Sequence, residues 1–143
     1  EHLHEIAETA VLNANYMLAR LRGRYEAPFN PPGTYCKHEC LITDKFQQQY
    51  GVSAMDISKR LLDYGHHAPT MDFPLHGCLL IEPTETALKE EADAFYDAMI
   101  KIDQEVRENS KIVLSAPHTT PVGRLSGATG SKKEAFRWMP HET

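Results

Sequence analysis

The densest group of metal-ligating side chains in the sequence comprises Cys36, His38 and Cys40. Residues 36–43 have the composition of a β-strand, and residues two apart on a strand point to the same face. Two thiols and an imidazole would then line up, and zinc prefers such ligands. A closed structural zinc site needs four ligands, however, and no second Cys/His pair stands at a familiar spacing. A strand that carries His38 or Glu39 towards a cleft is therefore favoured over a metal site.

A second group of candidate residues, His66 and His67, stands in a segment that proline should hold rigid. Pro69 and Pro74 fix φ and remove backbone donors, so residues 66–76 are predicted to form an irregular loop. Rigid loops beside strands often carry function, and an imidazole can carry a proton near neutral pH. The same two side chains could instead be solvated or cap a helix, and the composition alone leaves both interpretations open.

A carboxylate, Glu82, ends the short apolar strand that is predicted over residues 77–82. At the end of a buried strand, a carboxylate is either paired with a cation or placed at the edge of a cleft. The structural alternative is that this segment only starts a helix, with Thr84 or Thr86 as N-cap and Glu85 beside the helix dipole.

The candidate residues must be positioned by elements that hydrophobic periodicity predicts. Residues 3–22 carry apolar side chains at helical spacing, and Gly23 is a suitable stop residue. A second helix is predicted after Ser53, which can act as its N-cap, and it should end at Gly65. Asp56 suits the dipole of that helix, although a standard capping box has Glu or Gln at this position.

The longest predicted helix opens near Thr84 and Thr86 and continues to Asn109. Its apolar positions step by four and three residues, which is the spacing of one continuous apolar face. The residues of this stripe are Leu88, Ala92, Phe95, Met99, Ile102 and Val106. The acidic residues fall largely on the other faces of the helix, so the stripe should pack on the core.

The remaining sequence predicts a short apolar piece at 112–114 and an irregular tail rich in proline and glycine. We expect residues 116–143 to form an extended arm that packs mainly through aromatic side chains, Phe136 and Trp138 among them. Residues 1–115 then form one domain in the order helix, strand, helix, strand, long helix. Short strands under helices indicate a small two-layer α+β fold.

Composition excludes several classes of protein. The chain has 143 residues, 41% hydrophobic and 24% charged, which fits one globular domain and neither a disordered chain nor a coiled coil. No apolar run reaches the roughly 20 residues of a membrane-spanning helix, so no membrane association is expected. The net charge of −5 and the lack of dense Lys/Arg with interleaved aromatic residues argue against a nucleic-acid partner.

The cysteines and the N-terminal residues indicate the cellular compartment of the protein. Three cysteines at irregular spacing do not suggest a secreted disulfide framework, so reduced thiols in a cytosolic-type compartment are expected. The first residues lack both the basic start and the apolar stretch of a signal peptide. They resemble the inside of a helix, and we expect the sequence to be a piece of a longer chain. Glycine-rich phosphate-binding motifs and the nucleophile elbow are absent.

Long motifs in the same order resemble the C-terminal region of the glycine cleavage system P-protein, the decarboxylating glycine dehydrogenase. The central motifs are DISKRLLDYGHHAPT and LIEPTE, and the matching stretches are 12–17, 38–39, 56–70, 80–85, 116–121 and 137–138. The ending resembles subunit 2 of the two-subunit prokaryotic form. Two departures concern the lining of a pocket: Cys40-Leu41 stands where the family has Phe-Ile, and His66 stands where an aromatic residue is expected.

The resemblance implies a pyridoxal-phosphate enzyme with the aspartate-aminotransferase-like fold (fold type I), of which this chain is the small C-terminal domain. Such an enzyme decarboxylates glycine and passes the aminomethyl group to the lipoyl arm of the H-protein. The family's Schiff-base lysine lies in a His-Lys-Thr context upstream, and no lysine here has that context. We therefore expect no catalytic residue, no bound pyridoxal phosphate and no activity in the isolated chain.

The same resemblance implies partners and candidate contacts. The partners are the upstream cofactor-binding domain of the same subunit, subunit 1, the lipoylated H-protein and glycine, in the cytoplasm. The candidate substrate-binding residues are the polar positions of the motif strands and loops: His38, Glu39, His67, Thr70 and Thr84. Arg60 is expected to face solvent. The alternatives are a free-standing module that binds proteins through residues 84–108, or a metal-binding module.

Overall fold

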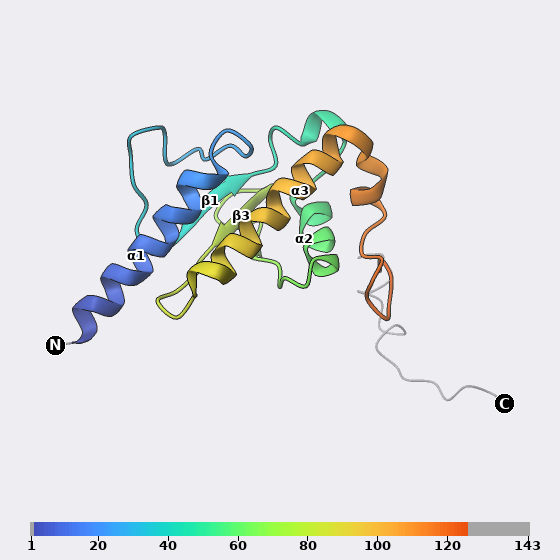
Figure 1. Cartoon of the computed structure of the whole chain (residues 1–143). Helices are drawn as coiled ribbons and strands as arrows, with labels where there is room; N and C mark the ends of the chain where they lie inside the picture. Colours follow the sequence, from blue (N-terminus) through green and yellow to red (C-terminus); the bar gives the residue numbers. More distant parts are fainter. Residues whose placement is uncertain (1, 126–143) are drawn as a thin grey trace.

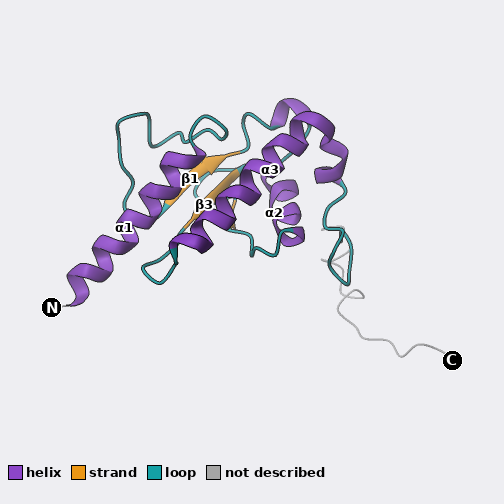
Figure 2. Cartoon of the chain, viewed as in Figure 1, coloured by secondary structure: helices purple, strands orange, loops and turns teal. Residues whose placement is uncertain are grey.

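The structure is a computed structural model that describes residues 2–125 of the chain, and it has the predicted α+β architecture (Figure 1). Figure 2 shows α1 and α3 lying across the same face of a small sheet, with α2 packed beside α3. The elements in chain order are α1 (His2–Leu21), β1 (Cys40–Thr43), a 3₁₀ turn (Gln48–Tyr50), α2 (Ala54–Asp63), β2 (Thr70–Met71), β3 (Cys78–Ile81) and α3 (Lys89–Leu114).

The helices form where periodicity predicts them, because each buries one apolar stripe. The buried residues of α1 are Ala14, Met17, Leu18 and Leu21. Those of α3 include Ala92, Met99, Ile102 and Val106, so most of the predicted stripe faces the core. Gly23 follows α1 with a φ of +84°, which a glycine adopts without strain.

The sheet is antiparallel with the order β1-β3-β2, so β3 lies in the middle. Leu80 of β3 is paired with Leu41 of β1 on one side and with Thr70 of β2 on the other. The prediction that all of residues 66–76 are irregular is therefore wrong for the two residues of β2. These follow Pro69, which has no N–H to donate and stands just before the edge strand, so no hydrogen bond of the ladder is lost.

The prediction of a strand over residues 36–43 is wrong in its first half, since β1 begins at Cys40. The Asn15 side chain of α1 takes up the backbone of Cys36 instead. Its amide nitrogen donates to the Cys36 carbonyl at 2.8 Å, and its amide oxygen accepts from the Cys36 N–H at 2.9 Å. The Asn15 side chain thus occupies the N–H and carbonyl groups of Cys36 that a longer β-ladder would need. As a result, Cys36, His38 and Cys40 do not line one face of a strand.

The N-terminus of α2 is capped as the sequence predicts, and Asp56 completes a capping box. Its carboxylate accepts a hydrogen bond from the backbone N–H of Ser53 at 2.8 Å. A second carboxylate, Asp44, accepts from the Ala54 N–H at 2.8 Å. Gly65 ends the helix with a φ of +78°. The shorter Asp side chain therefore replaces the expected Glu or Gln.

The predicted limits of the longest helix are wrong at both ends. The helix begins at Lys89, and Leu88 is its N-cap, with the Leu88 N–H donating to the Glu91 carboxylate at 2.9 Å. Thr84 and Thr86 share a hydroxyl contact of 3.0 Å in the preceding loop, so neither caps α3. At its other end α3 kinks at Asn109 and continues to Leu114, because the fully buried Val113 anchors the last turn.

The tail returns to α2. Ala116 and Pro117 are buried, and the Asp63 carboxylate accepts hydrogen bonds from the backbone N–H groups of His118 and Thr119 at 2.6 and 2.8 Å. The aromatic residues through which the arm was predicted to pack lie outside the described residues. None of the helices in the described part is both long enough and apolar enough to cross a membrane.

Candidate functional site

One cavity, called here the main cavity, has a volume of about 460 Å³ and lies where the loop after α2, the end of β3 and the start of α3 meet α1. It contains two of the predicted residues, His67 and Thr70. Its other lining residues are Met17, Ala68, Pro69, Leu80, Ile81, Glu82, Pro83, Ala87, Glu91, Ala92 and Phe95. Mostly apolar walls with a few polar groups are typical of a small-molecule site.

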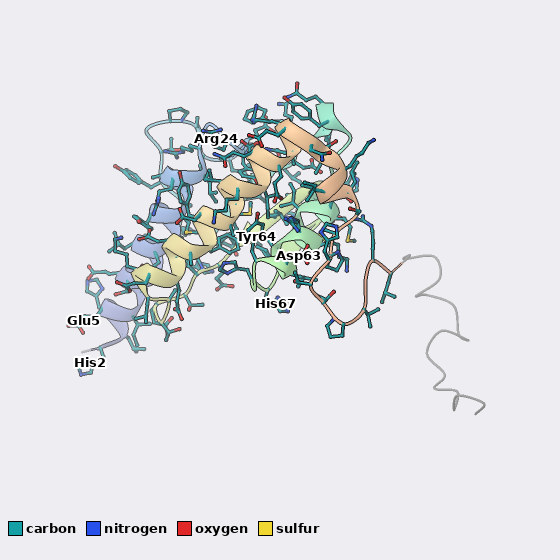
Figure 3. The ribbon with its side chains drawn as sticks, turned by 45° about the vertical axis from the view of Figure 1, so that its right-hand side comes forward. His2, Glu5, Arg24, Asp63, Tyr64 and His67 are labelled. Carbon is teal, nitrogen blue, oxygen red and sulfur yellow. The ribbon has the colours of Figure 1, made fainter. Side chains whose placement is uncertain are left out.

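The loop after α2 places His67 at this cavity and leaves its ring accessible. The turn at Gly65 directs the chain away from α2, and the half-buried ring of His66 packs edge-on against Phe95 with centroids 5.5 Å apart. The next ring, His67, is exposed (Figure 3). Its Nδ1 lies 3.0 Å from the carbonyl oxygen of Ala68. One histidine is therefore structural, and the other is available to a ligand.

Two more predicted residues, His38 and Thr84, lie in a neighbouring groove, called here the α1 groove, of about 460 Å³. The α1 groove is lined by Leu3, Ile6, Ala7, Ala10, Val11, Lys37, His38, Glu82, Thr84 and Glu85. Glu82 lines both spaces, and its carboxylate lies 3.8 Å from Nε2 of His38. Both side chains of this pair are more than half exposed, so the contact adds little stability.

The fifth predicted residue, Glu39, is separate from the others. It lines a third hollow of about 310 Å³, beside Tyr35 and Cys36. The structure thus brings His67 and Thr70 together and places His38 and Thr84 in the adjoining groove. The role of these residues as substrate contacts stays a prediction.

Several lining residues were not among the sequence-predicted contacts. Glu91 lines the main cavity while its carboxylate also caps α3, and Phe95 and Met17 supply apolar walls. The periodicity of α1 and α3 marks Phe95 and Met17 as inward-facing, but periodicity does not separate a cavity wall from a packed core. The tertiary structure was needed to identify them as cavity residues.

The charges around the main cavity are negative. Among the described residues that line it, Glu82 and Glu91 are acidic, His67 is the titratable base, and none is Lys or Arg. Such a wall can accept hydrogen bonds from an amine, and the imidazole can move a proton. The carboxylate of a ligand would have to be bound by residues outside this wall, because the best partners of a carboxylate are Arg and Lys.

Arg60 cannot serve as that partner, and the expectation that it faces solvent is wrong. Its guanidinium donates to the two Glu105 oxygens at 2.8 and 2.6 Å and to the Asp63 carboxylate at 2.8 Å. Only 14% of its side chain is exposed. The hydrogen bonds to Glu105 raise the pKa of Arg60 despite partial burial, so it stays charged and bound.

Two of the acidic residues of α3, Asp93 and Asp103, are paired with basic side chains of the same chain. The Asp93 carboxylate contacts Arg20 and Lys89, and the fully buried Asp103 accepts from Nε of Arg107 at 2.9 Å. Arg20 also lies over the ring of Tyr96, with Cζ 3.7 Å from the ring centroid. These contacts account for Asp93 and Asp103 within the chain, and a protein-binding face over residues 84–108 stays an untested alternative.

The thiol–imidazole metal site, the less favoured interpretation of Cys36, His38 and Cys40, is not assembled in the described residues. Cys40 is buried, and burial raises the pKa of its thiol to about 12, so it stays protonated and is a poor ligand. Cys36 is half-buried, and its backbone is held by Asn15. In residues 2–125 no group of three or more His, Cys, Asp or Glu side chains is placed to hold a metal ion.

The described lining of the main cavity also lacks the lysine amine to which pyridoxal phosphate is attached in enzymes. This cofactor is held through a lysine amine, and no lysine lines the main cavity within the described part of the chain. The described lysines that form ion pairs, Lys45 with Glu26 and Lys89 with Asp93, lie elsewhere. The described walls of the main cavity therefore offer no lysine amine to the cofactor.

Comparison with known proteins identifies what the chain resembles. The family model described as "Glycine dehydrogenase, C-terminal domain" matches residues 6–120. A "Probable glycine dehydrogenase (decarboxylating) subunit 2" from Exiguobacterium sibiricum is 49% identical over 98% of the chain. Proteins of the same name from Bacillus cereus and Bacillus cytotoxicus are 48% and 47% identical over 95% and 96% of it. The chain spans 28% of the length of each of these relatives.

Proposed function

Because the chain belongs to the family of glycine dehydrogenase C-terminal domains, we propose that it acts as the C-terminal domain of a subunit 2 of decarboxylating glycine dehydrogenase. The observation that carries this proposal is the 49% identity over almost the whole chain to a relative of that name. The chain spans only 28% of that relative, so the activity belongs to a larger protein. In that protein, residues 1–115 are the small domain of an aspartate-aminotransferase-like fold, and 116–143 are its arm.

The described residues supply one wall of the proposed active site. His67 is placed to exchange a proton or donate a hydrogen bond, and the Thr70 hydroxyl can do the latter. The carboxylates of Glu82 and Glu91 favour the amino side of an amino acid, because they can accept its hydrogen bonds. Glycine must lose its carboxylate as uncharged carbon dioxide, and a wall without Lys or Arg does not hold that group back.

The cofactor and partners follow from the family and belong to the same proposal. Pyridoxal phosphate, which acts as an electron sink in enzymes of this class, is held by upstream residues of the subunit. The upstream cofactor-binding domain, subunit 1, the lipoylated H-protein and glycine complete the reaction, in the cytoplasm. The isolated chain therefore neither binds the cofactor in stoichiometric amount nor decarboxylates glycine.

A joined polypeptide tests this proposal. It consists of the upstream region of the Exiguobacterium relative followed by residues 1–143, and it is combined with subunit 1, lipoylated H-protein and pyridoxal phosphate. We expect exchange of radiolabelled bicarbonate into the glycine carboxyl group from the joined polypeptide and none from residues 1–143 alone.

The complete subunit 2 of the same relative is the positive control, and circular dichroism verifies that each polypeptide is folded. A stoichiometric visible absorbance band when residues 1–143 alone are titrated with pyridoxal phosphate would contradict the proposal. A folded joined polypeptide without exchange, beside an active control, would contradict it as well.

A further inference from the structure

The apolar stripe of α1 is covered along only half of the helix. The C-terminal half is buried, since Ala14, Met17 and Leu21 are at most 1% exposed. The same stripe continues towards the N-terminus, but there Leu3 is 82% and Ile6 is 43% exposed. A stripe with one helical spacing therefore passes from the core of the domain into solvent.

The uncovered half has the composition of a contact surface. It lines the α1 groove, where apolar side chains of α1 lie beside the polar residues Lys37, His38, Glu82 and Glu85. Protein interfaces likewise combine exposed apolar side chains with polar ones. Figure 1 shows this end of α1 reaching beyond the sheet and α3.

The opposite side of the same helix segment faces water. His2 lies 3.4 Å from Glu5, and His4 lies 3.0 Å from Glu8, all with highly exposed side chains. Figure 3 shows His2 and Glu5 at the free end of the helix. The first turns of α1 are thus amphipathic, and a short helix in water is marginal without a partner for its apolar side.

We propose that the exposed half of the α1 stripe is the surface on which the preceding part of the same subunit packs. This inference rests on the proposed function, because it takes the chain as the C-terminal domain of a longer polypeptide. The relatives contain more than twice as much chain outside the matched region. In a C-terminal domain the preceding region is joined to the first turn of α1. This covalent connection gives the preceding region a high effective concentration at the exposed stripe.

The position of the α1 groove connects this interface with the proposed active site. Glu82 lines both the α1 groove and the main cavity. A segment seated in the α1 groove therefore shares Glu82 with the cavity that holds His67. The same contact would join the two parts of the subunit and place the upstream residues beside the cavity wall.

Hydrogen exchange followed by mass spectrometry tests the inference on residues 2–12. We expect these amides to exchange about tenfold more slowly, or slower still, in the joined polypeptide than in residues 1–143 alone. Ile6→Asp places a charge in the proposed interface and should restore fast exchange in the joined polypeptide. Leu12→Asp is the matched control, because Leu12 is 68% exposed, does not line the α1 groove, and should leave the protection unchanged.

Three outcomes would overturn the inference: equal exchange in both polypeptides, equal effects of Ile6→Asp and Leu12→Asp, or a dimer of residues 1–143 that Ile6→Asp dissociates. The last result would assign the surface to a second copy of the chain. Bicarbonate exchange separates this inference from the proposed function. Protection of residues 2–12 without activity refutes the function alone, and activity without protection refutes the interface alone.

Discussion

Single residues around the main cavity differ in how strongly other groups of the chain hold them. Arg60 is held by Glu105 and Asp63, and the ring of His66 packs on Phe95. His67 contacts only the neighbouring Ala68 carbonyl among the hydrogen bonds of the described residues. A side chain placed at a cavity without a structural partner can respond to a ligand.

We expect His67→Ala in the joined polypeptide to lower the rate of bicarbonate exchange by about 10²-fold or more, which is typical of a lost proton carrier. The stability of residues 1–143 should change by less than about 0.5 kcal/mol, because the ring is exposed. The exchange rate and urea unfolding measure the two effects.

The matched control for this substitution is His76→Ala. His76 is also an exposed histidine, its ring lies 3.0 Å from the Asp72 carboxylate, and it does not line the main cavity. Equal rates for the unchanged polypeptide and the His67→Ala variant would remove His67 from the proposed site. Equal losses in both variants would show that the effect is not specific to the cavity.

At the scale of elements, side chains from other elements set where β1 begins. Asn15 of α1 forms two hydrogen bonds with the backbone of Cys36, at 2.8 and 2.9 Å. The ladder with β3 starts four residues later, at Cys40. The segment between them carries His38 to the α1 groove and Glu39 to the third hollow, instead of presenting both on a regular strand.

Asn15→Ala should destabilise residues 1–143 by about 1–3 kcal/mol, because two hydrogen bonds are lost and the Cys36 backbone is left without partners. Hydrogen exchange of the segment around Cys36 should become faster at the same time. Urea unfolding measures the first effect. The exposed Leu12→Ala is the control on the same helix, and its change should stay within about 0.5 kcal/mol. An Asn15→Ala variant as stable as this control would contradict the assigned role.

At the scale of the whole molecule, α2 holds the start of the tail with two acidic side chains. Asp63 accepts from the backbone N–H groups of His118 and Thr119, and Asp56 forms an ion pair with Arg124 at 2.5 Å. Arg124 also donates to the Leu114 carbonyl at 2.9 Å, so it joins α2 to the end of α3. The described start of the arm is thus held against α2 and the end of α3.

The Asp63 carboxylate makes the stability of the domain depend on pH. Burial alone would raise its pKa, but the N–H groups of Thr119 and His118, together with Arg60, lower it to about 2. A carboxylate with a lowered pKa in the folded state stabilises that state above its unfolded value of about 3.9. We expect this contribution to be complete at pH 6 and lost progressively as the pH falls from about 4 to 2.

Asp63→Asn tests this expectation by urea unfolding at pH 6 and at pH 3. The variant should be less stable at pH 6, and the difference from the unchanged chain should shrink at pH 3, where protonation begins to remove the same charge. Asp97→Asn on α3 is the control, because 63% of that side chain is exposed. A difference that is the same at both pH values would refute the role of the Asp63 charge.

Local patterns in the sequence were sufficient for the α+β class, for α1 and α2 and for the apolar stripe of α3. A helix buries a face that repeats every three to four residues, and Ser53 and Gly65 bound α2 through groups close in sequence. The family was also accessible from the sequence, because the long ordered motifs need no fold to be compared. These features depend on neighbours along the chain.

Tertiary structure alone decided where β1 and α3 begin, that Thr70 joins a strand, and which candidates share a cavity. Asn15 reaches Cys36 from 21 residues away, and Arg60 reaches Glu105 from 45 residues away. Such contacts depend on packing between elements, and a capping or strand signal in a short segment does not contain them. The sequence by itself therefore determined the family, the helices α1 and α2 and the apolar stripe of α3. The folded chain decided which polar groups are used internally and left His67 and the first turns of α1 exposed.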